Sequence, residues 1–263
     1  GEKIGAFALT EPHAGSNAAD VKTRAVKEGN HFVLNGSKQF ITSGQNGDVV
    51  IVFAVTNPDQ GKRGISAFIV PTDTPGYKVT RIEKKLGLRC SDTAQITFDN
   101  MRLTPDLLLG KEGDGYKIAL SNLEGGRIGI AAQSVGMARA AFEVACDYAK
   151  DRTSFGDKII NHQAVGFRLA DMATEIEASE LLIYSAADKK NKGERMTLQG
   201  AMAKYYSSEV AVKVANDAVQ VLGGYGYTKD FPVERFYRDA KLCTIGEGTS
   251  EIQKLVIAKQ IIG

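Results

Sequence analysis

The hydrophobic and polar residues of this chain follow two different periods, one in each half. Over about the first 105 residues, apolar side chains alternate with polar ones in short runs, as in β-strands. The segments 48–56, 64–72 and 94–105 are rich in β-branched and aromatic residues and are bounded by turn-forming residues. Asn35-Gly36 predicts a hairpin turn between two short strands, because both residues tolerate positive φ. Strands at this spacing, with no helical pattern between them, predict an antiparallel β-barrel or sandwich.

After the glycine-rich stretch 110–115, the apolar positions recur at intervals of three and four residues, which is the period of a helix. Three stripes of this kind are Ile128, Ala132, Val135, Ala138, Phe142 and Ala145; Val165, Leu169, Met172, Ile176, Ile183 and Ala187; and Val212, Ala215, Val219 and Leu222. Their many alanines allow close contacts between helices, so the pattern predicts an antiparallel four-helix bundle. We therefore expect an α+β multidomain chain, with a β domain over residues 1–108 and a helical domain over residues 112–263.

Composition and charge exclude several classes of function. The 263 residues are 43% hydrophobic and 24% charged, which is enough apolar material for a sizeable core. With 33 basic and 31 acidic residues the net charge is +2, so we expect neither nucleic acid nor a membrane surface as a partner. No apolar run approaches the ~20 residues of a membrane span. The three cysteines and three histidines are scattered without metal-ligand spacing, so we expect reduced thiols and no metal site.

Two stretches contain small residues that could expose backbone N–H groups to a ligand. In the stretch 9–17, Gly15 and Ser16 follow a strand, so this loop could bind a phosphate, although an ordinary turn is the simpler interpretation. The stretch LGGYGY, residues 222–227, follows a helix and lacks the spacing of a dinucleotide-binding fingerprint. By itself it predicts only the end of a helix and a turn.

Charged residues stand beside glycines or an aromatic residue at two places in the helical half. In LEGGRIG, residues 123–129, Glu124 and Arg127 are spaced for an i,i+3 ion pair. Each of the two glycines between them is about 1 kcal/mol less favourable in a helix than alanine, which indicates that something approaches this backbone closely. Arg152, in DRTSFG, either complements a helix C-terminus or, together with Phe155, holds a planar or phosphorylated ligand.

A lone carboxylate stands between two glycines near the end of the chain, in the stretch CTIGEGTSEIQ, residues 243–253. Ser250 to Gln253 have capping-box spacing, so a helix is expected to begin at Thr249 or Ser250. Glu247 therefore precedes a helix N-terminus, where the helix dipole favours its charge, and its flanking glycines let a ligand come near. Two interpretations stay open on this stretch alone, a solvated loop glutamate and a catalytic base.

Taken together and in order, these stretches make the chain similar to the acyl-CoA dehydrogenase family, and in particular to its short-chain and short branched-chain members. The matching motifs cover the chain almost end to end: FALTEPHAGS, FITSG, LGLRCSDTAQITF, LEGGRIGIAAQSVGMA, DRTSFG, HQAVGFRLADMA, AVQVLGGYGY, VERFYRDAK and IGEGTSEIQKLVIA. The resemblance implies a β-barrel-like middle domain followed by a four-helix C-terminal domain. It also implies an all-helical N-terminal domain, which this sequence lacks, so we expect sequence upstream of residue 1.

The resemblance implies an FAD-dependent enzyme that dehydrogenates an acyl-CoA thioester in fatty acid β-oxidation or branched-chain amino acid catabolism. It also implies an electron-transfer flavoprotein as partner, a homotetramer built as a dimer of dimers, and a bacterial cytoplasm or mitochondrial matrix as location. The residues that it implies for FAD are Phe7, Leu9, Thr10, Gly15, Ser16, Phe40, Ile41, Thr42, Arg152, Phe155, Gln163, Gln220, Leu222, Gly223, Gly224, Thr249, Ser250 and Glu251. The residues that it implies for the substrate are Ser16, Glu124, Gly125, Gly126, Arg127 and Gly248.

Glu247 corresponds to the catalytic base of the family. Removing the α-proton and the β-hydride of a thioester together requires a base on one face of the substrate and flavin N5 on the other. Burial would raise the pKa of the Glu247 carboxyl and make it a better base than a free glutamate. Some relatives carry the base on the earlier helix, directly before the arginine, where this chain has Gly126. The sequence therefore favours Glu247.

Gly246 departs from the family pattern, because relatives usually have Tyr at this position. Losing that ring should widen the pocket, so we expect tolerance of a branched or otherwise bulky short acyl group. Two alternatives stay open, an acyl-CoA oxidase that passes its electrons to oxygen and a non-catalytic flavoprotein or truncated subunit of the same fold. The presence of Glu247 argues against the non-catalytic alternative.

Overall fold

The computed structural model describes all 263 residues, and they form two compact units, Gly1–Asn122 and Leu123–Gly263. The strands of the first unit are β1 (Gly5–Ala8), β2 (Arg24–Glu28), β3 (His31–Thr42), β4 (Val49–Val55), β5 (Ile65–Pro71), β6 (Tyr77–Ile82), β7 (Thr93–Leu103) and β8 (Leu108–Leu109). This unit also contains the short 3₁₀ helices η1 (Pro58–Gly64) and η2 (Pro105–Leu107). The α+β fold class predicted from the sequence is confirmed.

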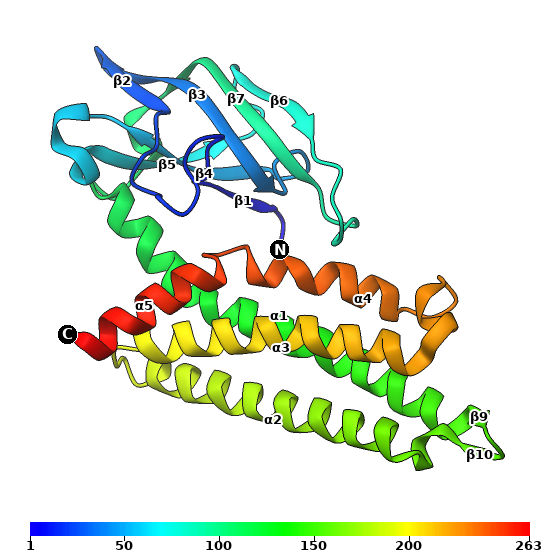
Figure 1. Cartoon of the computed structure of the whole chain (residues 1–263). Helices are drawn as coiled ribbons and strands as arrows, with labels where there is room; N and C mark the ends of the chain where they lie inside the picture. Colours follow the sequence, from blue (N-terminus) through cyan, green and yellow to red (C-terminus); the bar gives the residue numbers. More distant parts are fainter. The chain divides into compact units, whose positions relative to one another are not determined.

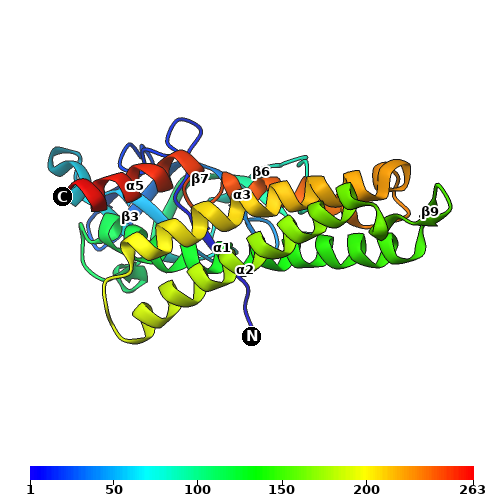
Figure 2. The same ribbon diagram turned by 60° about the horizontal axis from the view of Figure 1, so that its bottom comes forward.

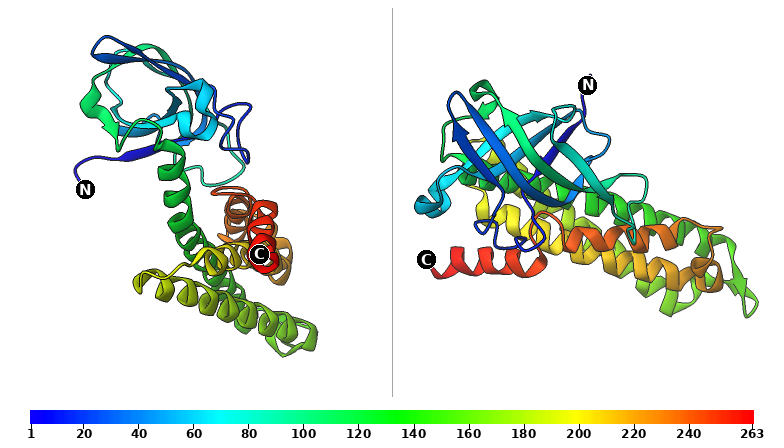
Figure 3. Two further views of the ribbon diagram at one scale, coloured as in Figure 1. Left: turned by 90° about the vertical axis from the view of Figure 1, so that its left-hand side faces the viewer. Right: turned by 90° about the horizontal axis from the view of Figure 1, so that it is seen from above.

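The eight strands of the first unit form one sheet in the order β6-β7-β3-β2-β4-β5-β8, with β1 beside β4 (Figure 1). The sheet curls into a barrel-like ring, which is seen end-on in the left view of Figure 3. Most neighbouring strands are antiparallel as expected, but β1 and β2 both run parallel to β4. Apolar side chains fill the core, among them Phe32 and Phe68, whose rings meet edge to face with centroids 5.2 Å apart.

β3 is a single strand of 12 residues, so the hairpin turn predicted at Asn35-Gly36 is wrong. The pairing of β3 with β7 shifts register at this point, which marks a β-bulge. Gly36 has a φ of 146°, and a Cβ at this position would lie 2.6 Å from Thr23 Oγ1, so close packing requires glycine here. The turn lies earlier, between β2 and β3, where Gly29 has a φ of 58°.

A fully buried ion pair ties the loop after β1 to β3. Lys38 Nζ donates to Glu11 Oε1 at 2.7 Å and to the Leu9 carbonyl at 3.1 Å. The Glu11 carboxylate also accepts the backbone N–H groups of Lys22 at 2.7 Å and Thr23 at 3.1 Å. Burial raises the pKa of Glu11, but the attraction of Lys38 and these hydrogen bonds outweigh it and hold that pKa below its usual value. Burial lowers the pKa of Lys38 to about 8, so the pair is charged at neutral pH.

The second unit is helical and contains most of α1 (Gly115–Asp151). The other helices are α2 (Gln163–Asn191), α3 (Thr197–Leu222), α4 (Val233–Ala240) and α5 (Ser250–Ile262). Between them lie a hairpin of β9 (Thr153–Ser154) and β10 (Asp157–Lys158) and the 3₁₀ helices η3 (Ile159–Asn161), η4 (Gly223–Tyr227) and η5 (Lys241–Thr244). Figure 2 shows the long helices running lengthwise through this unit. No helix of the chain combines the length and the apolar character of a membrane span.

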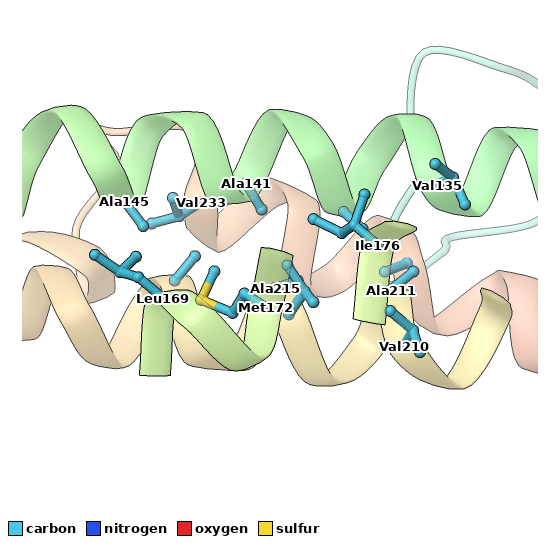
Figure 4. Packing of buried hydrophobic residues seen from close by; sticks show 14 of the residues in the cluster. Val135, Ala141, Ala145, Leu169, Met172, Ile176, Val210, Ala211, Ala215 and Val233 are labelled. Carbon is cyan, nitrogen blue, oxygen red and sulfur yellow. The ribbon is translucent and has the colours of Figure 1, made fainter. Parts of the chain in front are cut away.

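The core of the second unit is built from small apolar side chains. Figure 4 shows Val135 and Ala141 of α1, Met172 of α2, Ala215 of α3 and Val233 of α4 in one buried cluster. Every predicted stripe position is at least half-buried, except Ala132 of α1, which is exposed. The neighbouring residue 131 is buried in its place, because each step along a helix turns the side chain by about 100°.

We expect Lys38→Met to lower the free energy of unfolding by about 3–5 kcal/mol, because it leaves the Glu11 carboxylate buried without its cation. The double variant Glu11→Gln/Lys38→Met removes both charges and should recover more than half of this loss. In the wild type, the stability that ionised Glu11 contributes is present above the usual glutamate pKa and is lost as pH falls through its lowered pKa. Urea unfolding at several pH values measures both effects. A double variant no more stable than Lys38→Met would contradict the pairing.

Candidate functional site

Glu247 lies in the loop between η5 and α5, in a backbone conformation that few side chains adopt. Its φ is 56° and that of Gly248 is 92°, so two consecutive residues have positive φ. Two fully buried side chains hold this loop. Lys204 Nζ donates to the Gly248 carbonyl at 2.7 Å, and Gln253 Nε2 donates to the same carbonyl at 3.0 Å and to the Glu247 carbonyl at 3.4 Å. These hydrogen bonds fix the backbone from which the carboxylate projects.

α5 begins at Ser250 as expected, but Ser250 is not its N-cap, so the capping box predicted from Ser250 and Gln253 is wrong. Thr249 is the N-cap, and its Oγ1 accepts a backbone N–H from the first turn at 3.3 Å. The Ser250 hydroxyl instead donates to Glu209 Oε1 of α3 at 2.5 Å. In a capping box, Gln253 would accept the N–H of the N-cap residue. Its Nε2 instead donates to the carbonyls of Glu247 and Gly248.

Glu247 is half-buried, and its Oε2 is removed from water and has no hydrogen-bond partner. Burial raises the pKa of the Glu247 carboxyl above its usual value, and the positive charges of Lys204 and Arg127 oppose this shift without cancelling it. An oxygen that is free of donors and belongs to a carboxyl with a raised pKa is suited to accept a proton. The environment of Glu247 is therefore not that of a solvated loop glutamate.

Gly126 of α1 provides the space in which this carboxylate lies. A Cβ at residue 126 would be 2.7 Å from Glu247 Oε2, which is closer than real Cβ contacts allow. By contrast, a Cβ at Gly129, one turn further along the same helix, would have nothing within 4 Å. The close approach that the glycine pair indicated is thus, at Gly126, the approach of Glu247 itself.

Arg127 and Glu124 do not form the ion pair that their spacing predicted. Glu124 instead accepts a hydrogen bond from the Thr197 hydroxyl at the start of α3. The Nε of Arg127 is buried without a hydrogen-bond partner. Burial lowers the pKa of the Arg127 guanidinium, while the charges of Glu124 and Glu247 raise it. The helix therefore presents a desolvated cation, with one donor free, in the electrostatic field of the Glu247 carboxylate.

In the first unit, a backbone hydrogen bond joins the two segments that were predicted to hold the flavin. The N–H of Gln39 donates to the Thr10 carbonyl at 2.9 Å. Phe40 has a φ of 57° and is 64% exposed, so its ring lies at the surface near the end of β3. The other predicted positions are exposed at Gly15, Ser16 and Thr42, half-buried at Phe7 and buried at Leu9 and Ile41. An exposed ring and small residues with accessible backbone fit a planar, phosphorylated group such as FAD.

In the second unit, the predicted cofactor residues lie at the ends of helices. Arg152 follows α1, and Phe155 lies in the β9–β10 hairpin, 99% exposed with a φ of 53°. The remaining positions are Gln163 at the start of α2, Gln220, Leu222, Gly223 and Gly224 at the end of α3, and Thr249, Ser250 and Glu251 at the start of α5. All of them except Leu222 and Ser250 are exposed or half-buried. Unpaired N–H groups at a helix N-terminus suit an anion, so the first turn of α5 fits a phosphate of FAD.

Lys204 and Gln253, which hold the Glu247 loop, are absent from the predicted site residues. Lys204 lies on the buried face of α3, next to Ala203. A lysine is almost never fully buried without a partner, so a lysine within an alanine-rich stripe is a signal that could have found it. Gln253 carried no separate signal, because the apparent capping box accounted for it.

Comparison with known proteins gives matches over the whole chain. Residues 6–101 match the middle domain of acyl-CoA dehydrogenase, and residues 113–262 match its C-terminal domain. An acyl-CoA dehydrogenase of Bacillus subtilis (strain 168) is 55% identical over 263 residues, which are 100% of this chain and 69% of that protein.

Two solved structures superpose with a TM-score of 0.98, and each match covers 99% of this chain and 68% of the other chain. One is butyryl-CoA dehydrogenase from Megasphaera elsdenii, which is 45% identical. The other, 47% identical, comes from work on the electron transferring flavoprotein of Acidaminococcus fermentans and flavin-based electron bifurcation. The chain therefore spans about two thirds of the length of the proteins that it matches.

Proposed function

Since the chain belongs to the acyl-CoA dehydrogenase family, whose members are flavin-dependent oxidoreductases, we propose that it dehydrogenates a short-chain acyl-CoA thioester to the trans-2-enoyl-CoA. The observation that carries this proposal is the Glu247 carboxylate, whose Oε2 is buried and unpartnered and whose pKa is raised. The butyryl-CoA dehydrogenase among the matching structures supports a short acyl chain.

In this proposal Glu247 Oε2 takes the α-proton of the thioester. That proton is a weak acid, so the base has to be poorly solvated, and burial of Glu247 meets this requirement. The nearby charges of Lys204 and Arg127 keep the carboxyl from holding its proton too tightly. The backbone N–H of Glu247 donates to the thioester oxygen, where negative charge develops as the proton leaves.

Bound FAD supplies the acceptor for the hydride that leaves the β-carbon. We assign its binding to the exposed Phe40 region, to the Gly15–Ser16 loop and to the helix end around Thr249, whereas the helix ends around Arg152 and Gly223 would reach the FAD of a neighbouring subunit. Glu124 to Arg127 and Gly248 would contact the substrate. An electron-transfer flavoprotein as acceptor is supported by the Acidaminococcus fermentans structure. Assembly into a homotetramer stays a prediction, and so does the location of the protein in a bacterial cytoplasm or a mitochondrial matrix.

The first test of this function is Glu247→Gln in the FAD-loaded protein. We expect the variant to keep its yellow flavin absorbance, because the amide has nearly the shape of the carboxyl. We also expect bleaching by butyryl-CoA to slow by about 10²–10⁴-fold, since a neutral amide cannot take the α-proton. Stopped-flow absorbance under anaerobic conditions measures the rate. Normal bleaching by the variant would remove Glu247 from the mechanism, and a wild type that binds no FAD would contradict the function itself.

Gly126→Ala and Gly129→Ala form a matched pair on α1. Both exchange a helical glycine for alanine and should leave the fold intact or more stable by about 1 kcal/mol. Only the methyl group at residue 126 displaces the flexible end of Glu247, so we expect that variant to lose about 10²-fold in bleaching rate while Gly129→Ala stays close to wild type. Thermal unfolding checks stability beside the rate. Equal rates in the two variants would show that the position of the carboxylate does not matter.

The Gly246 substitution tests the proposed tolerance of branched acyl groups. A Cβ at this position would meet nothing closer than the Leu242 carbonyl at 3.7 Å, so the backbone accepts a side chain. We expect the wild type to accept both 2-methylbutyryl-CoA and butyryl-CoA as substrates. In Gly246→Tyr the kcat/KM for the branched substrate should fall about 10-fold or more relative to the straight one. Rejection of every branched substrate by the wild type would refute the proposal.

A further inference from the structure

Lys204 is a buried lysine whose only direct partner is a backbone carbonyl. It lies on α3 with 0% of its surface exposed. Its Nζ donates to the Gly248 carbonyl at 2.7 Å. Taking an ammonium group out of water is costly unless charges or strong acceptors compensate it. An alanine-rich helix core gains nothing from such a residue, so its position calls for an explanation beyond packing.

We propose that Lys204 is a positioning residue that holds the Glu247 loop in its left-handed conformation and sets the proton affinity of the Glu247 carboxyl. The inference rests on the proposed function, because it gives a role to the base that the function requires. It concerns residues of the second unit only.

The geometric part of this proposal comes from the carbonyl of Gly248. Two buried donors converge on that oxygen from different helices, Lys204 from α3 at 2.7 Å and Gln253 from α5 at 3.0 Å. A charged donor makes a stronger hydrogen bond than a neutral amide, so Lys204 is the stronger of the two. Because Glu247 and Gly248 are consecutive, fixing the Gly248 carbonyl anchors the backbone next to the residue that carries the carboxylate, and Gln253 also reaches the Glu247 carbonyl at 3.4 Å.

The electrostatic part comes from the few titratable groups that act on Glu247 and on Lys204. Two cations act on Glu247, namely Lys204 from α3 and Arg127 from α1. The groups that act on Lys204 are Cys243 of η5, Glu209 of α3, Glu247 and Arg127. Burial lowers the pKa of Lys204 to about 8, so most of its charge is present at neutral pH and is lost as the pH rises through that value. Lys204 thus counters the effect of burial on Glu247 only while it is protonated.

The carboxyl-carbon NMR signal of labelled glutamate measures this coupling in the purified full chain without any turnover. The Glu247 signal is identified by its loss in Glu247→Gln. We expect the wild-type signal to titrate at the pKa of Glu247 and to show a second, smaller step near pH 8, when Lys204 loses its proton. The absence of the second step would overturn the proposal, and this measurement requires no variant at position 204.

Three variants separate charge from hydrogen bonding. Lys204→Met keeps the length of the side chain but not the charge, so the proton affinity of Glu247 should rise about tenfold or more and the second step should vanish. Lys204→Arg keeps the charge and should hold the first titration within about threefold of wild type. Gln253→Met removes a donor to the same carbonyl without removing a charge, and it should move the Glu247 titration less than Lys204→Met does.

Other outcomes have a definite meaning. A folded Lys204→Met with an unchanged Glu247 titration, or an equal shift in Gln253→Met, would overturn the proposal. In the FAD-loaded enzyme, the bleaching rate increases with pH as Glu247 loses its proton. In Lys204→Met this increase should occur at higher pH than in the wild type, because Glu247 then holds its proton more tightly. Failure of the proposed function is seen separately, as a wild type that binds no FAD or is not bleached by butyryl-CoA, and would leave the NMR coupling intact.

Discussion

The site depends on one constraint. The Glu247 carboxylate lies against the backbone of α1, with its Oε2 buried and without a hydrogen-bond partner. Cβ atoms cover the surface of a helix and normally keep other groups at a distance. Gly126 has no Cβ, and the Glu247 Oε2 lies only 2.7 Å from the point where a Cβ would be. The glycine costs α1 about 1 kcal/mol of helix stability. Packing of the buried alanine stripe of this 37-residue helix stabilises it and offsets that cost.

The loop must present the carboxylate from the other side, and this requires strain. A glutamate with a φ of 56° is about 1–3 kcal/mol less favourable than in an ordinary conformation, so the surrounding structure has to hold it there. Gln253 and Lys204 do so through two neighbouring carbonyls. Three helices therefore meet at one residue: α1 gives the space, α3 the charged donor and α5 the neutral donor. A base held in this way sits on the rigid part of the unit, although it lies in a loop.

The sequence is sufficient for the features that depend on local pattern and fails where contacts distant in sequence decide. The change of hydrophobic period distinguishes the strands of the first half from the helices of the second. Strands alternate every two residues and helices repeat every three to four, and each element shows its period several times. The start of α5 at Ser250 also follows from local residues. The hairpin at Asn35-Gly36 is wrong because close packing of Gly36 against Thr23 places a bulge there. Similarly, the partner of Glu124 is 73 residues away, and no spacing rule indicates it.

The same constraint explains why residues 126 and 247 have to be considered as a pair. The Cβ of a glutamate at position 126 would lie 2.7 Å from the Glu247 Oε2, too close for the two side chains to keep these positions. Even if both carboxylates found room, two like charges in a desolvated site would force one of them to keep its proton. The cations that act on Glu247 are Arg127, which is half-buried, and Lys204, which is fully buried, and burial lowers the pKa of both. Burial favours the protonated form of the carboxyl while the two cations favour its ionised form, so Glu247 can ionise and yet regain a proton, as a reversible base must.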